Sequence, residues 1–297
     1  MRLTLIDGDL IVYETAFCAA AKEKDGVYLN WYQVSKIVNT IVRGILLGSK
    51  ATHHLGFLTE GHSNFRNKVA TTLPYKGQRK TNAEKPKFYD EVRDYLQKHF
   101  GFQMMRGVEA DDALTIASEH FKGKPNVVTI IATKDKDLWQ YAGHHYNMNT
   151  KKLMEISEGE ANRNFWRQMI LGDMGTDNIP GLSHAMKWEL VFKNDAAKKA
   201  YRGIPCQQYG EVTADAILDA TDPKDYPSVI FELYLDAYGT DEDDLFGEQR
   251  FYETAQLIYM LREAPKGLVI HFNPVKVKAT DTLFDNEYDG FRPALEF

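Results

Sequence analysis

The chain contains 297 residues with a formal net charge of −6, and 43% of its residues are apolar and 26% charged. This length suits one large α/β domain with an appendage, or two domains, and the composition is that of a globular protein. No stretch approaches the ~18 uncharged apolar residues of a membrane span, and the net charge argues against a uniformly basic protein that coats nucleic acid.

The first predicted strand, residues 3–6, ends at Asp7-Gly8, and a helix begins shortly afterwards. Ligand sites of open parallel sheets form at the carboxyl ends of strands, and Gly8 allows a sharp turn that points Asp7 into such a crevice. Taken alone, this pair is better explained by a plain turn. Because the chain starts directly on a strand, without an apolar signal segment, we expect a cytoplasmic protein that contacts no membrane.

A basic segment follows the second predicted strand, residues 54–58, and the acid Glu60. Between residues 66 and 87, seven basic residues face a single acid: Arg66, Lys68, Lys76, Arg79, Lys80, Lys85 and Lys87 against Glu84. Together with the Tyr75 ring, this pattern is typical of a segment that follows a phosphate backbone, although a solvated loop is the simple alternative. We expect the segment to be mobile until an anionic partner orders it.

Three carboxylates, Glu109, Asp111 and Asp112, occur within four residues where the predicted strand 102–105 passes into a helix. A helix N-terminus favours one or two acids. Three crowded acids raise one another's pKa values unless a cation or a basic side chain is shared among them, and a divalent metal ion is the simplest candidate.

Two further pairs of acids follow in the chain. The β-branched strand 127–132 ends at Asp135 and Asp137, and a predicted helix, residues 162–172, runs into a glycine-rich turn with Asp173 and Asp177. Asp135 and Asp137 could be surface charges beside Lys136. However, four predicted strands deliver acids to one sheet edge, which is unfavourable unless metal ions neutralise it. Beyond residue 182 we expect a small helical region and one strand-like run, residues 268–272.

The order of these motifs resembles the flap endonuclease and 5′ nuclease superfamily, most closely the stand-alone 5′–3′ exonucleases of tailed phages. The resemblance spans residues 3–181 and rests on Asp7-Gly8, Phe65-Arg66, Tyr75-Lys76-Gly77-Gln78-Arg79, Gly107-Val108-Glu109-Ala110-Asp111-Asp112, Asp135-Lys136-Asp137, Gly172-Asp173 and Asp177-Asn178-Ile179-Pro180-Gly181. It implies a mostly parallel central sheet flanked by helices, a PIN-like α/β core, with a helical C-terminal region. The implied domains are a nuclease core at residues 1–181, with a mobile basic arch at 62–100, and a DNA-binding region at 182–297.

The resemblance also implies roles for individual residues. It assigns one metal ion to Asp7, Glu60, Glu109 and Asp111, and a second to Asp112, Asp135, Asp137, Asp173 and Asp177. It places Lys76 and Arg79 at the scissile phosphate as catalytic residues, and it assigns DNA contacts to Arg66, Tyr75, Lys76, Arg79 and Lys80. Here Thr59-Glu60 stands where the family usually has Asp, and residues 182–187 lack the glycines of the family's helix-hairpin-helix.

The implied function is two-metal, Mg²⁺-dependent 5′–3′ exonuclease activity on DNA, in phage replication if the chain is phage-encoded and then in the host cytoplasm. Mn²⁺ is an expected substitute, and flapped DNA or RNA–DNA hybrids are further expected substrates. The absence of a His or Cys cluster argues against zinc. Three alternatives remain: a module that binds branched or duplex DNA without cutting it, a shorter PIN-type RNase, and a Ca²⁺-binding structural protein.

Overall fold

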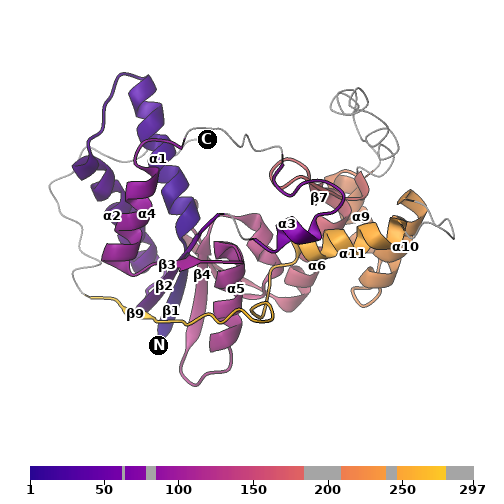
Figure 1. The fold of residues 1–297 in the computed structure, drawn as a ribbon. Helices are drawn as coiled ribbons and strands as arrows, with labels where there is room; N and C mark the ends of the chain where they lie inside the picture. Colours follow the sequence, from indigo (N-terminus) through magenta and orange to yellow (C-terminus); the bar gives the residue numbers. More distant parts are fainter. Residues whose placement is uncertain (62–63, 78–84, 184–208, 239–245, 279–297) are drawn as a thin grey trace.

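The computed structural model describes residues 1–61, 64–77, 85–183, 209–238 and 246–278. Figure 1 shows a central sheet with helices on both faces, beside a second group of helices formed mainly by the C-terminal half of the chain. Arg79 and Lys80 lie outside the described residues.

The sheet has the strand order β3-β2-β1-β4-β5-β6, with β9 paired to β2. Its strands are β1 (Arg2–Asp7), β2 (His53–Thr59), β3 (Gln103–Met105), β4 (Val128–Thr133), β5 (Gly143–Asn147), β6 (Lys152–Ile156) and β9 (Val275–Lys276). The pairings among β3, β2, β1, β4 and β5 are parallel, whereas β5–β6 and β2–β9 are antiparallel. The prediction of a mostly parallel sheet is therefore confirmed, and the carboxyl ends of β1, β2 and β4 lie at one edge.

Helices cover both faces of the sheet. One face packs against α1 (Gly8–Lys24), α2 (Trp31–Gly48) and α4 (Tyr89–Phe100), through a core that includes Ile11, Val38 and Leu96. The other face packs against α5 (Ala110–Phe121), whose Ala113, Leu114 and Ala117 are fully buried. Residues 268–272 cross this second layer with Leu268, Ile270 and Phe272 partly buried.

A third core joins the helices beside the sheet. It contains α6 (Glu158–Leu171), α9 (Glu211–Ala220), α10 (Tyr226–Tyr238) and α11 (Phe246–Ile258), together with Tyr75 from the basic segment. The short helix α3 (Arg66–Val69) lies against α11, and the 3-10 helix η1 (Lys136–Gln140) lies against α6. Because α6 packs with α9–α11, the helical region includes an element that precedes residue 181.

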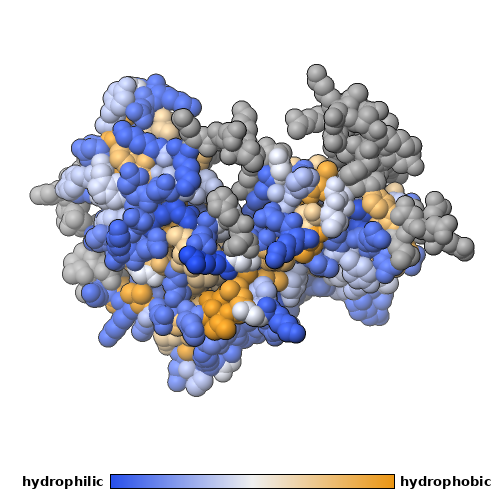
Figure 2. Space-filling view, in the orientation of Figure 1, coloured by the Kyte–Doolittle hydropathy of each residue, from blue (hydrophilic) through white to orange (hydrophobic). Residues whose placement is uncertain are grey.

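Two elements differ from the sequence-based prediction. The β5–β6 hairpin was not predicted, and residues 268–272 form no strand, the nearest strand being β9. Leu268, Ile270 and Phe272 alternate because they pack against the α5 layer, and their alternation mimics a strand. Figure 2 shows that the surface in this view is largely hydrophilic, and among the described residues no helix is long and apolar enough to cross a membrane.

Candidate metal centre

Three elements bring acids to the carboxyl edge of the sheet. Asp7 ends β1 and caps the N-terminus of α1, where its Oδ1 accepts from the Leu10 amide at 3.3 Å. Glu109 caps α5 and Asp111 lies in its first turn, while Asp135 caps η1 after β4. Each acid lies where the chain leaves the end of a strand and begins the next helix, which is the geometry that the sequence predicted.

Asp7 is 6% exposed, and Thr133 Oγ1 donates to its Oδ2 at 3.3 Å. Burial, with the nearby charges of Asp9 and Asp135, raises the pKa of Asp7 to about 8. A carboxyl group in this position binds a proton at neutral pH unless a cation stabilises its charged form.

Lys76 and Tyr75 lie against the carboxylates of Glu109 and Asp177. Lys76 Nζ forms an ion pair with Glu109 and lies 3.8 Å from Asp177 Oδ1, and its amide donates to the Asp177 carbonyl at 2.8 Å. Tyr75 Oη lies 2.7 Å from Glu109 Oε2 and 2.9 Å from Asp177 Oδ2, so its single proton serves one of the two at a time. Burial lowers the pKa of Lys76, but Glu109 and Asp177 outweigh it and the pKa is raised.

The pKa values of the two acids at the start of α5 are shifted in opposite directions. Burial raises the pKa of Glu109, but Lys76 and Arg66 more than compensate, and the pKa of Glu109 is lowered. Burial and the charges of Glu109 and Asp112 raise the pKa of Asp111 well above its usual value. The basic residues therefore neutralise Glu109 but leave Asp111 without sufficient positive charge.

Asp137, Asp173 and Asp177 form the other side of the site. Burial, with the charges of Asp135, Asp173 and Asp177, raises the pKa of Asp137 to about 7, and Gln168 Nε2 donates to its Oδ1 at 2.5 Å. Asp173 lies in β7 (Gly172–Asp173), which pairs with β8 (Ile179–Pro180).

The turn that carries Asp173 and Asp177 depends on two glycines. A Cβ on Gly172 would lie 2.2 Å from the Gly181 amide nitrogen, and one on Gly181 would lie 2.3 Å from the Gly172 nitrogen. Gly172 also has a φ of +65°, which side-chain-bearing residues rarely adopt. Only glycine at both positions allows this close approach, which holds the turn against the site.

Seven acids are linked by these contacts and mutual charge effects, and we call them the carboxylate cluster: Asp7, Glu109, Asp111, Asp135, Asp137, Asp173 and Asp177. Its donors are all oxygen, which suits hard cations such as Mg²⁺. The raised pKa values of Asp7, Asp111 and Asp137 show that the protein's own groups do not stabilise the charged form of these carboxyls, which a bound cation would do. Within the described ranges, no three His, Cys, Asp or Glu side chains are already arranged to hold a metal ion. The cluster fits divalent cations by donor chemistry and charge, and side chains such as Lys76 must move for them to bind.

Residues 2–166 match the family model of the 5′–3′ exonuclease N-terminal resolvase-like domain. The chain belongs to this family. The match confirms the predicted 5′ nuclease relationship and identifies a nuclease.

Among solved structures, the chain is similar to the flap endonuclease of bacteriophage T5, crystallised as a pseudo-enzyme–product complex with DNA and metal ions. The two share 18% sequence identity over 86% of this chain and 100% of that chain, with a TM-score of 0.47. No curated protein matches the chain.

In this 5′ nuclease, two residues predicted to act at the site are buried and bonded to each other. Arg66, predicted to contact DNA, is 1% exposed, and Asp112, predicted to bind the second metal ion, is fully buried. Arg66 Nη1 and Nη2 donate to the two Asp112 oxygens at 2.5 and 2.9 Å, and Nε donates to the Leu257 carbonyl at 2.8 Å. This buried pair is closed to solvent and joins α3, α5 and the end of α11, so neither predicted role is supported.

Tyr75 and Glu60 also differ from their predicted roles. Tyr75 is 8% exposed and its ring belongs to the third core, so it offers no face for stacking on a base. Glu60 is exposed, and its Oε1 accepts from Arg106 Nε at 2.8 Å. The structure therefore pairs Glu60 with Arg106 instead of placing it among the cluster carboxylates.

Sequence reasoning missed two residues that contact the site. The single Thr59 amide N–H is shared by the two Asp9 carboxylate oxygens, and Asp9 Oδ1 lies 3.4 Å from Arg93 Nη1. The charge of Asp9 raises the pKa of Asp7. The Asp7-Gly8-Asp9 pattern contained this signal, because residues two apart at a helix start lie near one another. Gln168 comes from α6 in the third core, and nothing in its local sequence points to Asp137.

Proposed function

We propose that this 5′ nuclease is a two-metal-dependent exonuclease that hydrolyses DNA phosphodiester bonds from 5′ ends, with Mg²⁺ as its ion. The observation that carries the proposal is the carboxylate cluster, in which acids from separate elements meet and three of them have raised pKa values. A binding surface for anionic DNA gains nothing from such a concentration of negative charge, whereas a divalent-metal site requires it.

In this proposal, Asp7, Glu109 and Asp111 hold the first ion, and Asp135, Asp137, Asp173 and Asp177 hold the second, some through water. Glu60 joins the first set only if its carboxylate leaves Arg106. Asp112 is left out because Arg66 binds both of its oxygens. Bound divalent ions supply a nucleophilic water at neutral pH and neutralise charge on the phosphate.

The protein's own residues orient the site and add positive charge. Tyr75 Oη donates to Glu109 or to Asp177, one at a time, and the Arg66–Asp112 pair fixes the first turn of α5. Lys76 is proposed to leave Glu109 when DNA and metal ions bind, and to place its ammonium group against the scissile phosphate. Arg79 and Lys80 are proposed to contact the DNA backbone nearby.

One observation favours a second candidate, a module that binds structured DNA without cutting it. No group of three potential ligands in the described part of the chain is arranged for metal, and Lys76 is already ion-paired with Glu109. This candidate predicts DNA binding that neither requires Mg²⁺ nor leads to cleavage.

Duplex DNA labelled at either the 5′ or the 3′ end separates the two candidates. With Mg²⁺, we expect 5′-labelled duplex to release short 5′-phosphorylated products at once, while 3′-labelled duplex shortens progressively, and EDTA should stop both. Matched flapped and RNA–DNA hybrid substrates report the expected related activities. Intact substrate at enzyme excess, with Mg²⁺ or Mn²⁺, would reject the nuclease proposal and leave the binding module.

A further inference from the structure

Asn178 belongs to the Asp177-Asn178-Ile179-Pro180-Gly181 motif, and the proposed function gives its side chain no role. Its Nδ2 donates to the Pro74 carbonyl at 2.8 Å, although the two residues lie 104 positions apart in the sequence. Asn178 also has a φ of +62°, a conformation that asparagine adopts more readily than most residues with a side chain. The contact therefore joins the turn that carries Asp177 to the basic segment that carries Lys76.

The Pro74 carbonyl closes the turn that carries Lys76. It accepts from the Gly77 amide at 2.9 Å, so residues 74–77 form a β-turn with Lys76 as its third residue. Lys76 has a φ of +56°, which glycine adopts most easily and which lysine adopts only at an energetic cost. Such a turn persists only where surrounding contacts support it.

Two contacts from Asp177 and Asn178 support this turn. The Asn178 side chain donates to the Pro74 carbonyl, and the Asp177 carbonyl accepts from the Lys76 amide at 2.8 Å. Because the contacts engage the first and third residues of the turn, they fix its orientation as well as its position. The Lys76 ammonium group consequently forms an ion pair with Glu109 and lies 3.8 Å from Asp177 Oδ1.

We propose that Asn178 is a positioning residue, whose hydrogen bond to the Pro74 carbonyl holds the 74–77 turn against the carboxylate cluster and so places the Lys76 ammonium group for the scissile phosphate. Because this bond holds the backbone, the Lys76 side chain can leave Glu109 without movement of the turn. The catalytic part of this role rests on the proposed function, whereas the placement of Lys76 is a property of the metal-free protein.

Asn178→Gly removes the donor without straining the backbone, because glycine adopts a positive φ readily. Acetylation of the full chain in EDTA with an N-hydroxysuccinimide ester, followed by mass spectrometry, measures how far the ion pair with Glu109 shields Lys76. We expect the variant to raise the rate at Lys76 about fivefold, the factor by which loss of one hydrogen bond typically changes an equilibrium. The rate at the exposed Lys68 should not change. An unchanged rate at Lys76 in the folded variant overturns the proposal.

Asn126→Gly is the matched control for the backbone change. Asn126 has a φ of +61° and lies in a turn before β4, so the substitution makes the same change outside the 74–77 turn. It should leave the acetylation rate of Lys76 at the wild-type value. A rise in Asn126→Gly equal to that in Asn178→Gly would attribute the effect to glycine itself and overturn the proposal.

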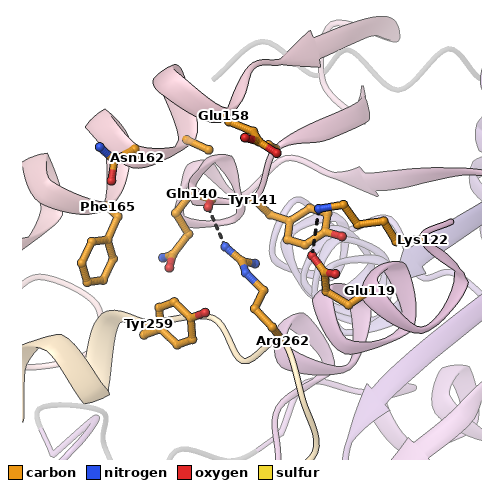
Figure 3. A pocket seen from close by; sticks show the side chains of 11 residues that line it. Glu119, Lys122, Gln140, Tyr141, Glu158, Asn162, Phe165, Tyr259 and Arg262 are labelled. Carbon is orange, nitrogen blue, oxygen red and sulfur yellow. Dashed lines mark hydrogen bonds and ion pairs between the residues drawn. The ribbon is translucent and has the colours of Figure 1, made fainter. Parts of the chain in front are cut away.

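A cavity of about 250 Å³ between η1, α6 and the segment that follows α11 provides a second control. Figure 3 shows Asn162 in its lining, to which residues 74–77 and 177–178 do not contribute. Asn162 Oδ1 accepts from Trp166 Nε1 at 3.1 Å, so Asn162→Ala removes one asparagine hydrogen bond away from the Lys76 turn. This variant should leave the acetylation of Lys76 unchanged. An equal rise would show general loosening of the structure and contradict the proposal.

Single-turnover cleavage and DNA binding separate positioning from direct DNA contact. We expect Asn178→Gly to lower the cleavage rate about fivefold and to leave the Kd for DNA in EDTA unchanged. In a Lys76→Met background the same substitution should not lower the rate further, because its effect passes through Lys76. Equal rate losses in the two backgrounds overturn the positioning role. A wild-type protein that cuts no DNA would reject the nuclease function, and the acetylation rates would still decide whether Asn178 places Lys76.

Discussion

Lys76 and divalent metal ions compete for the same oxygens in the proposed site. The Lys76 ammonium group is ion-paired with Glu109 and lies near Asp177, two of the proposed metal ligands. Its pKa is raised by these acids, although burial alone would lower it, so it remains charged at neutral pH. In the absence of metal it neutralises part of the cluster.

Lys76→Met is therefore expected to have two opposite effects. The metal-free protein should melt at a lower temperature, and Mg²⁺ should bind more tightly, because no ammonium group has to be displaced. Cleavage should fall about 10²-fold or more if the ammonium group stabilises the transition state. Thermal melts across an Mg²⁺ titration and single-turnover cleavage measure the three effects.

Lys68→Met is the matched control, since Lys68 is an exposed lysine of the same basic segment. It should leave the Mg²⁺ midpoint unchanged. If Lys76→Met weakens Mg²⁺ binding, the two cations do not compete as argued.

Asp7 makes the stability of the metal-free protein depend on pH. Its folded pKa of about 8 exceeds the ordinary aspartate pKa of 3.8, so the folded state binds the proton more tightly than the unfolded state. This contribution is fully present below about pH 4 and is lost as pH rises to about 8, on the order of a few kcal/mol. The free energy of unfolding in EDTA should therefore decline across this window.

Asp7→Asn should flatten that decline, since the amide keeps an oxygen for the Leu10 amide without carrying charge. Urea unfolding in EDTA between about pH 5 and pH 8.5 measures the slope. Asp25→Asn, at an exposed acid after α1, should retain the wild-type slope. An equal slope in Asp7→Asn and wild type would show that Asp7 is not the residue responsible.

At the scale of single residues, the sequence predicted the positions of several acids but not which side chains are buried. Strand ends and helix starts are visible in local patterns, so the positions of Asp7, Glu109 and Asp135 followed from them. Arg66 and Tyr75 occur in a basic segment whose composition predicts exposure to solvent, yet both are buried. Arg66 is covered by residues nearly 200 positions away in the sequence, and Tyr75 packs in the third core. Such long-range packing leaves no local signal.

At the scale of elements, the Arg66–Asp112 pair ties three segments together. Arg66 from α3 binds Asp112 of α5, and its side chain also donates to the carbonyls of Leu257 and Tyr259 at the end of α11. Removing one partner of a fully buried pair leaves an unpaired charge, which is strongly destabilising.

Arg66→Met should therefore lower the free energy of unfolding by about 3–5 kcal/mol. Arg106→Met removes an exposed arginine from its pair with Glu60 and should cost less than about 1 kcal/mol. Urea unfolding at pH 7 compares the two variants. If Arg66→Met instead retained wild-type stability and lost DNA affinity, the phosphate contact predicted from sequence would be correct after all.

A helix or strand is predictable from sequence when it is long and regularly patterned, and is not when only its pairing with a distant strand defines it. Strand β4 is mostly apolar and β-branched, and helix α6 begins at a capping box from Ser157 and Glu160. Both appear within a few residues of the expected bounds, 127–132 and 162–172. The β5–β6 hairpin contains His144, His145 and Asn147 and lacks regular alternation, so only pairing with β4 reveals it. Gly172 and Gly181 indicated a turn in the sequence, but the sequence did not show that their two backbones lie against each other.

At the scale of the whole molecule, the carboxylate cluster lies where separately packed parts meet. Asp7 ends strand β1 and Asp135 follows strand β4, whereas Glu109 follows Val108 of the second core. Asp177 contacts Tyr75 of the third core. Metal ions shared among these acids would therefore cross-link the sheet and the helical region. Their binding should stabilise the entire fold cooperatively and not one segment alone.

This linkage predicts that Mg²⁺ raises the melting temperature, by an amount that grows with pH. Ligand carboxylates must lose their protons before they bind metal, and the pKa values are about 8 for Asp7 and about 7 for Asp137. Protons therefore compete with Mg²⁺ at about pH 6 and much less at about pH 8.5. An Mg²⁺ concentration 100-fold above its Kd should add about 2.7 kcal/mol to the free energy of unfolding.

Melts in Mg²⁺ and in NaCl of equal ionic strength, at each pH, separate specific binding from screening. We expect the Mg²⁺ midpoint to fall by about tenfold or more between the two pH values, and Asp137→Asn to reduce both the stabilisation and its pH dependence. An Mg²⁺ effect no larger than that of NaCl at about pH 8.5 would mean that these acids hold no metal ion, because at that pH their charge is greatest and proton competition is weakest.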